Sequence, residues 1–108
     1  MKRLSIILTL ALSLVNAAIA QDYYAIGNQA YADGDYATAI NNYQKALDSV
    51  GISAETYYNL GNAYYRSNEL GLAILNYERA LAVNPLYKDA KYNLEIAQER
   101  ITDNVTRS

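Results

Sequence analysis

The 108-residue sequence predicts an all-α protein: a helical solenoid of two helix-turn-helix units and a C-terminal capping helix, preceded by a signal peptide. Three observations predict it. The N-terminus is apolar and ends in small residues, the sequence repeats itself, and apolar residues recur with helical spacing inside each repeat. The domain boundaries that follow are 1–20 for the signal peptide, 21–52 for the first unit, 53–86 for the second unit, and 87–108 for the capping helix and C-terminal tail.

The first 20 residues have the pattern of a secretory signal peptide. Lys2 and Arg3 precede an apolar run over residues 4–15, and Ala18-Ile19-Ala20 supplies small residues at the spacing that a signal peptidase accepts. This pattern predicts export to the periplasm or to the periplasmic face of the inner membrane. Two alternatives are an uncleaved membrane tether, because about 17 apolar residues is the lower limit for crossing a bilayer, and a buried core helix.

Composition excludes most kinds of chemistry. The chain has no Cys and no His, which removes lipid attachment, disulfides, thiol catalysis, the commonest metal ligands and the usual general base. Without Lys2 and Arg3, 7 basic residues face 11 acidic ones, so the net charge of residues 21–108 is −4. A mildly acidic domain without a basic cluster is a poor nucleic-acid binder. We therefore expect no enzyme, no catalytic residue, no metal, no cofactor and no nucleic-acid partner.

The repeat has a period of 34 residues. Such a period is typical of helical solenoids, in which each unit buries its apolar face by stacking on the next. Identical residues that this shift superimposes are Tyr24 with Tyr58 and Tyr92, Gly27 with Gly61, Asn28 with Asn62, Tyr31 with Tyr65, Ala39 with Ala73, Tyr43 with Tyr77, and Ala46 with Ala80.

Helical spacing and turn residues place five helices. The first unit turns at Asp33-Gly34-Asp35 and the second at Ser67-Asn68-Glu69, while Ser53 opens the second unit and Asn84-Pro85 closes it. The Asp33-Gly34-Asp35 turn is not a calcium loop, because the remaining ligand series is absent. We expect helices over residues 22–33, 36–49, 54–67, 70–83 and 86–103.

Residues 23–85 resemble two tetratricopeptide repeats (TPR), and residues 86–103 resemble the capping helix of that family. The first unit departs from the family pattern at Ala30 and Gly51, and the capping helix has Glu95 in place of Gly. The residues that carry the resemblance, all expected to be structural, are Gly27, Ala39, Tyr43, Ala46, Leu60, Gly61, Tyr64, Ala73, Tyr77, Ala80 and Pro85. The resemblance implies a non-enzymatic module that binds proteins.

A narrower resemblance covers three runs of the sequence, at residues 57–66, 71–85 and 92–95. There the chain is similar to exported TPR proteins of Bacteroidetes, in particular to the N-terminal segment of the aerotolerance-operon TPR family. Members of that family continue into membrane-associated sequence, so the resemblance leaves open that this chain is a fragment of a longer protein.

Polar and aromatic residues left over from packing form rows on the first helix of each unit. Asn amides bind peptide backbones and Tyr rings offer rigid contact area, so these rows predict a concave groove for a peptide or partner protein of the envelope. The predicted groove residues are Tyr24, Asn28, Tyr31, Tyr58, Asn59, Asn62, Tyr65, Arg66, Tyr92 and Asn93.

Some grooves of the family hold a C-terminal carboxylate with Lys, Arg and Asn. Asn28 and Asn59 match two amide positions of such a clamp, whereas Tyr24, Asp89 and Asn93 stand at its cationic positions. We therefore expect a neutral or weakly polar ligand segment rather than an acidic tail.

Two other interpretations of these features stay open. The Asn side chains could instead bond neighbouring helices, with the Tyr rings only covering the groove floor. The chain could also self-associate into a homo-oligomer or assembly scaffold, because two and a half units are expected to leave Ile96, Ala97 and Ile101 poorly covered.

Overall fold

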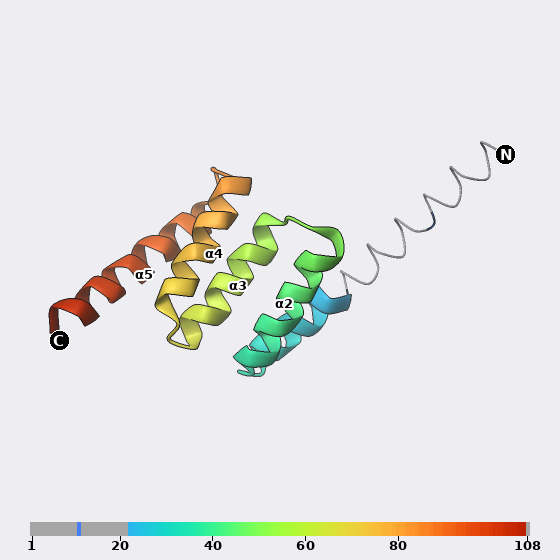
Figure 1. Ribbon diagram of the computed structural model, residues 1–108, viewed down its shortest axis with the longest axis horizontal. Helices are drawn as coiled ribbons and strands as arrows, with labels where there is room; N and C mark the ends of the chain where they lie inside the picture. The colour runs from blue at the N-terminus through green and yellow to red at the C-terminus, as the bar shows by residue number, and fades with distance from the viewer. Residues whose placement is uncertain (1–10, 12–21, 108) are drawn as a thin grey trace.

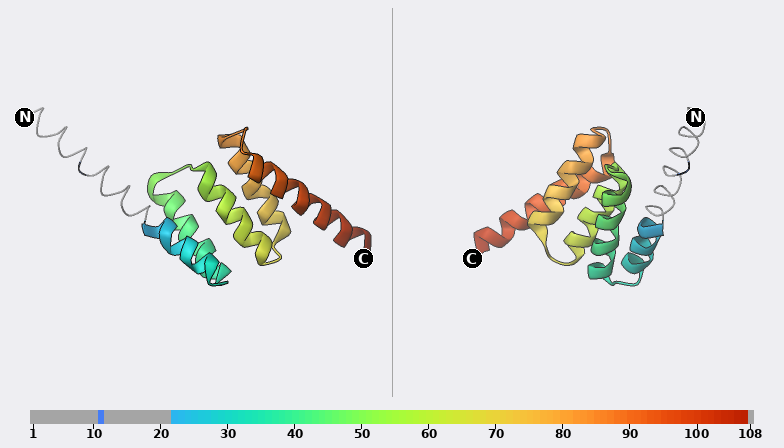
Figure 2. Two further views of the ribbon diagram at one scale, coloured as in Figure 1. Left: turned by 180° about the vertical axis from the view of Figure 1, so that it is seen from behind. Right: turned by 45° about the vertical axis from the view of Figure 1, so that its right-hand side comes forward.

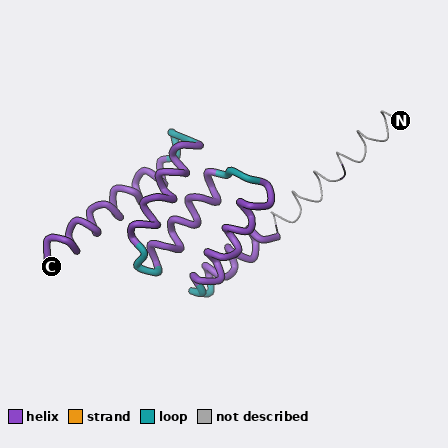
Figure 3. Tube along the Cα trace, viewed as in Figure 1, coloured by secondary structure: helices purple, strands orange, loops and turns teal. Residues whose placement is uncertain are grey.

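The computed structural model describes residue 11 and residues 22–107, and the predicted signal peptide over residues 1–20 lies outside the described residues apart from residue 11. Residues 22–32 are helical. Four further helices follow: α2 (Tyr36–Val50), α3 (Ala54–Arg66), α4 (Leu70–Val83) and α5 (Lys88–Arg107). Residues 22–107 contain no strand (Figure 3), which confirms the all-α prediction. No helix among the described residues combines the length and the apolar character needed to cross a membrane.

The helices form two layers. Figure 1 looks onto α2 and α4, and the view from behind in Figure 2 brings the helix over residues 22–32 and α5 to the front. Helix α3 packs against α2, α4 and α5, so it is the element that joins the two units. This alternation of first and second helices is the predicted solenoid of two units and one capping helix.

Local sequence explains where the helices begin. Asp35 caps α2 by accepting hydrogen bonds from the backbone N–H of Thr38 (3.2 Å) and from the Thr38 hydroxyl (2.7 Å), and this bonding lowers the pKa of the Asp35 carboxyl. Ser53 caps α3 in the same way through the backbone N–H of Thr56. Gly34 (φ 79°) and Asn68 (φ 62°) take the left-handed conformation that ends the first helix of each unit.

A tyrosine ring packed on a glycine joins the two helices of each unit. Tyr43 and Tyr77 are each 1% exposed. A Cβ added to Gly27 would lie 2.7 Å from the Tyr43 ring, and one added to Gly61 would lie 2.6 Å from the Tyr77 ring. Since real Cβ atoms do not approach so closely, only glycine lets the ring pack this closely against the neighbouring helix.

The other family-pattern residues are also mostly interior. Tyr64 is partly buried, and Pro85 is exposed in the turn that follows α4. The fully or nearly fully buried members are Ala39, Ala46, Leu60, Ala73 and Ala80, with Gly27 and Gly61.

Helix α5 differs from expectation in two ways. It extends to Arg107, four residues beyond the predicted end at residue 103, and the expectation that Ala97 is poorly covered is wrong. Ala97 is fully buried, because it packs against Ala73 and Tyr77 of α4. Ile96 and Ile101 are partly buried. The inner face of α5 is therefore closed by α4, although no second helix follows within the described residues.

Candidate ligand-binding groove

Each buried tyrosine hydroxyl donates a short hydrogen bond to an asparagine one position after the glycine on which its ring lies. The Tyr43 hydroxyl donates to Asn28 Oδ1 at 2.6 Å, and the Tyr77 hydroxyl donates to Asn62 Oδ1 at 2.6 Å. A buried phenol without such an acceptor would destabilise the fold by about 1–3 kcal/mol. Glycine, asparagine and tyrosine thus act together, and the same arrangement occurs in both units.

A second set of hydrogen bonds joins successive first helices. Asn59 Nδ2 donates to the Tyr24 hydroxyl at 2.8 Å, and Asn93 Nδ2 donates to the Tyr58 hydroxyl at 3.2 Å. Asn93 Nδ2 also donates to Asn62 Oδ1 at 3.0 Å. The two bonds to tyrosine have the same sequence separation, so the predicted rows of Tyr and Asn are bonded to one another across the units.

In most of these amide groups, one end is hydrogen-bonded within the protein and the other end is not. Among the described residues, Asn62 uses only its oxygen, which leaves its Nδ2 without a hydrogen-bond partner, whereas the Asn28 amide also bonds the Tyr24 hydroxyl. Asn59 and Asn93 use only their nitrogens, which leaves each Oδ1 without one. These amides therefore do bond neighbouring helices, and the Asn62 nitrogen and the Asn59 and Asn93 oxygens make no hydrogen bond among the described residues.

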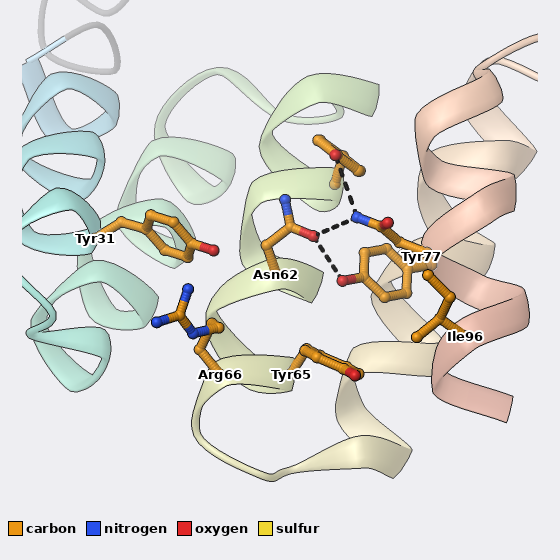
Figure 4. Close-up of a pocket in the computed structure, with 8 residues that line it drawn as sticks. Tyr31, Asn62, Tyr65, Arg66, Tyr77 and Ile96 are labelled. Carbon is orange, nitrogen blue, oxygen red and sulfur yellow. Dashed lines mark hydrogen bonds between the residues drawn. The ribbon is translucent and has the colours of Figure 1, made fainter. Parts of the chain in front are cut away.

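A pocket of about 350 Å³ lies over α3, on the layer of the first helices (Figure 4). Its floor is the cluster of Asn62, Tyr77 and Asn93, whose hydrogen bonds are drawn in the figure. Its lining residues are Tyr31, Tyr58, Asn62, Tyr65, Arg66, Tyr77, Asn93 and Ile96.

A smaller hollow of about 90 Å³ shares Tyr31 and Asn62 with this pocket. We call the two together the groove, and the residues that line the smaller part are Asn28, Tyr31, Tyr43, Asn59 and Asn62.

Eight of the ten predicted groove residues line the groove, and Tyr24 and Tyr92 do not. Tyr24 is partly buried, with its ring 5.9 Å from the Tyr43 ring, so its role is to hold Asn59 in place. Tyr92 is 65% exposed and lines neither part.

Sequence reasoning missed three lining residues. Tyr43 and Tyr77 were assigned to packing alone, yet their hydroxyl ends reach the groove floor through Asn28 and Asn62. Ile96 lies 34 residues after Asn62, on the face of the capping helix that continues the predicted rows, and it was expected to be poorly covered rather than to line the groove.

The tyrosine rings that line the pocket are held in fixed positions. The Tyr31 ring makes an edge contact with Tyr36 at 5.4 Å between centroids, and Tyr58 lies 5.0 Å from Tyr87. The guanidinium of Arg100 lies 5.1 Å from the centre of the Tyr65 ring, a cation–π contact. Rigid aromatic faces lose little conformational entropy when a ligand packs on them.

Arg66 is the single charged residue in the lining of the pocket. Its guanidinium lies 5.2 Å from the centre of the Tyr36 ring, which orients it at the rim, and no ion pair or hydrogen bond engages it among the described residues. The pocket therefore offers one cation in an otherwise neutral, phenol-rich surface. The described residues hold no group of acidic side chains arranged to bind a metal ion.

A separate hollow of about 590 Å³ lies on the opposite layer, between α2 and α4. Its lining includes Leu47, Leu72, Leu75 and Arg79. Asn76 also borders it, but Asn76 is 2% exposed and its unpartnered Oδ1 is itself buried, so a ligand in this hollow would not reach that oxygen without rearrangement. The free polar groups described above all belong to the groove.

The helical-repeat fold agrees with the comparisons to known families. Residues 27–68 match a family model described as a TPR repeat, and residues 54–87 match one described as a tetratricopeptide repeat. The chain belongs to the tetratricopeptide repeat family, whose fold serves protein interaction and is generally non-enzymatic. None of the curated proteins matches the chain.

Two solved structures are similar to this chain. The Sgt2 TPR domain from Aspergillus fumigatus is 28% identical with a TM-score of 0.73, and the match covers 78% of this chain and 56% of that one. The first TPR of Spaghetti (RPAP3), bound to the HSP90 peptide SRMEEVD, is 24% identical with a TM-score of 0.75, and the match covers 81% of this chain and 71% of that one. The chain thus spans little more than half the length of the Sgt2 structure.

Burial raises the pKa of the tyrosine hydroxyls that are hydrogen-bonded to the asparagines of the groove. The pKa of Tyr43 rises to about 12, mainly through burial and secondly through its Tyr24 neighbour. The pKa of Tyr77 is raised still further by burial, although the Asn93 amide opposes the rise. Burial also raises the pKa of Tyr24, and the Glu55 carboxylate adds to the effect.

These shifts predict a loss of stability in alkali. Above pH 10 the unfolded chain loses phenol protons that the folded chain keeps, so the contribution of these tyrosines to the free energy of unfolding is constant below about pH 10 and falls between pH 10 and 12. Each such tyrosine adds up to about 1.4 kcal/mol per pH unit to the fall. Urea titrations followed by circular dichroism from pH 8 to 11.5 measure this. The double variant Tyr43→Phe/Tyr77→Phe should show a shallower fall, and an equal slope in both proteins would contradict the assignment.

Proposed function

We propose that this chain is an exported, non-enzymatic interaction module that binds an extended peptide segment of a partner protein in the groove. The observation that carries the proposal is the set of groove groups left unbonded within the protein. Asn62 presents an N–H donor, Asn59 and Asn93 present C=O acceptors, and the backbone of an extended peptide needs both. The family membership supports a protein-binding role in general.

The chemistry of the groove favours a neutral segment. The peptide SRMEEVD, which the first TPR of Spaghetti holds, is acidic. Arg66 alone carries charge in the lining of the pocket here, and Asp89 and Asn93 occupy positions where a carboxylate clamp has cations. An acidic tail would leave most of its charges unpaired, so we propose a ligand of low net charge.

Self-association through α5 is less well supported as the main function. Position 95 is equivalent to Gly27 and Gly61, the glycines on which a tyrosine of the second helix packs. Glu95 is exposed at this position, so α5 lacks the glycine that a further helix would pack on in the same way. The closure of Ala97 against α4, with Ile96 and Ile101 partly buried, also reduces the uncovered apolar surface that favoured stacking. The narrower likeness to the aerotolerance-operon family stays a prediction from the sequence.

Export rests on the sequence of residues 1–20. Mass spectrometry of the chain recovered from the envelope of an expressing bacterium should give a protein that begins at Gln21. Recovery of the chain with Met1 in the membrane fraction would favour the uncleaved tether, and recovery in the cytoplasmic fraction would contradict export.

The groove is tested by selecting peptides from a random displayed library on the immobilised full chain and measuring their affinity by fluorescence anisotropy. Arg66→Glu turns the free donors at the groove rim into acceptors and should weaken the selected peptides by about tenfold or more. Arg79→Glu makes the same charge change in the hollow between α2 and α4 and should leave their affinity unchanged. Equal losses in both variants, or a loss with Arg79→Glu alone, would place binding outside the groove.

A further inference from the structure

We propose that the preferred occupant of the groove is a proline-rich segment in the polyproline II conformation. The inference rests on the proposed function, because it names the class of peptide that the groove takes. Three properties of the pocket support it: its tyrosine faces are pre-positioned, its tyrosines recur at equivalent positions on successive helices, and its free polar groups are mainly donors.

The first property is a set of rigid aromatic faces. Tyr31, Tyr58 and Tyr65 all line the pocket, and each ring is held by a contact on another side, with Tyr36, Tyr87 and Arg100 respectively. Proline rings pack on such faces, and polyproline II segments dock on aromatic-lined grooves because neither partner loses much conformational freedom.

The second property is the spacing of those faces. Tyr31 and Tyr65 occupy equivalent positions on the helix over residues 22–32 and on α3, and the first helices of successive units contact one another, as α3 and α5 do. Packed helices lie about 8–10 Å apart. One turn of polyproline II advances about 9 Å over three residues, which is comparable to the general separation of packed helices, so we expect every third residue of the ligand to meet the next tyrosine face.

The third property is the balance of free hydrogen-bonding groups in the pocket. Asn62 Nδ2 and the Arg66 guanidinium are donors without a partner among the described residues, and the Tyr31 and Tyr65 hydroxyls are also unbonded there and able to donate. Asn93 Oδ1 is the one amide acceptor left in this lining. Proline residues present carbonyls and no N–H, so the prolines of such a segment pair with the donors of this pocket, and the residues between them supply the few N–H groups that the Asn59 and Asn93 oxygens accept.

A direct test compares labelled peptides of equal length on the full chain by fluorescence anisotropy. Decaproline should bind at least about tenfold more tightly than a ten-residue Gly-Ser peptide, because the flexible peptide must lose its freedom and lacks the rings. Decaproline should also displace the selected peptides. The acidic peptide SRMEEVD should bind more weakly than decaproline, since the pocket has a single cation.

Asn62→Asp isolates the donor that faces the ligand. The carboxylate keeps an oxygen to accept from the Tyr77 hydroxyl and from Asn93, while the free N–H donor becomes an acceptor that repels carbonyls. We expect decaproline to bind about fivefold more weakly or worse. Asn41→Asp makes the same change at an exposed position of α2 outside the groove and should leave affinity unchanged, and thermal unfolding verifies that both variants are folded.

The outcomes separate this inference from the proposed function. Equal binding of decaproline and the Gly-Ser peptide, or tighter binding of SRMEEVD than of decaproline, would overturn the polyproline II inference. If selected peptides then remain sensitive to Arg66→Glu, the proposed function stands with a different ligand class. If no peptide responds to either groove variant, both fail.

Discussion

The packing of a tyrosine ring on a glycine, with the hydroxyl of that ring bonded to the next asparagine, is the constraint on which the rest of this structure depends. It fixes how closely the two helices of a unit approach each other. In the second unit, for example, the Tyr77 ring packs on Gly61 and its hydroxyl donates to Asn62. It also fixes which end of the amide faces inward, because a buried phenol must donate to an oxygen. Helix packing and the polarity of the groove therefore follow from the same three side chains.

Hydrogen bonds of the same asparagine and tyrosine side chains also join one unit to the next. Asn93 donates both to Tyr58 and to Asn62, so the capping helix is tied to the bonded cluster of the second unit. Asn59 makes the equivalent bond to Tyr24 of the first unit. A chain without disulfides gains specificity of register from such bonds, because a shift of one helix by a single residue would leave several buried or half-buried polar groups without partners.

Much of this could be predicted from the sequence, because a repeat of 34 residues and helical spacing are properties of the chain itself. The turns, the Ser53 cap and the small residues at Gly27 and Gly61 followed from local rules. The orientation of the amides did not, since it depends on which buried hydroxyl each amide meets. The coverage of Ala97 was also misjudged, because α4 alone is enough to close that face of α5.

The most direct measurement of the central claim compares the unfolding free energies of Gly61→Ala and Gly71→Ala in urea. A Cβ at Gly61 would lie 2.6 Å from the Tyr77 ring, whereas one at Gly71 meets nothing within 4 Å. We predict that Gly61→Ala destabilises the protein by about 1–3 kcal/mol, and that Gly71→Ala is neutral or stabilises it by up to about 1 kcal/mol. Equal stability of the two variants would contradict the claim that the ring–glycine contact sets the helix packing.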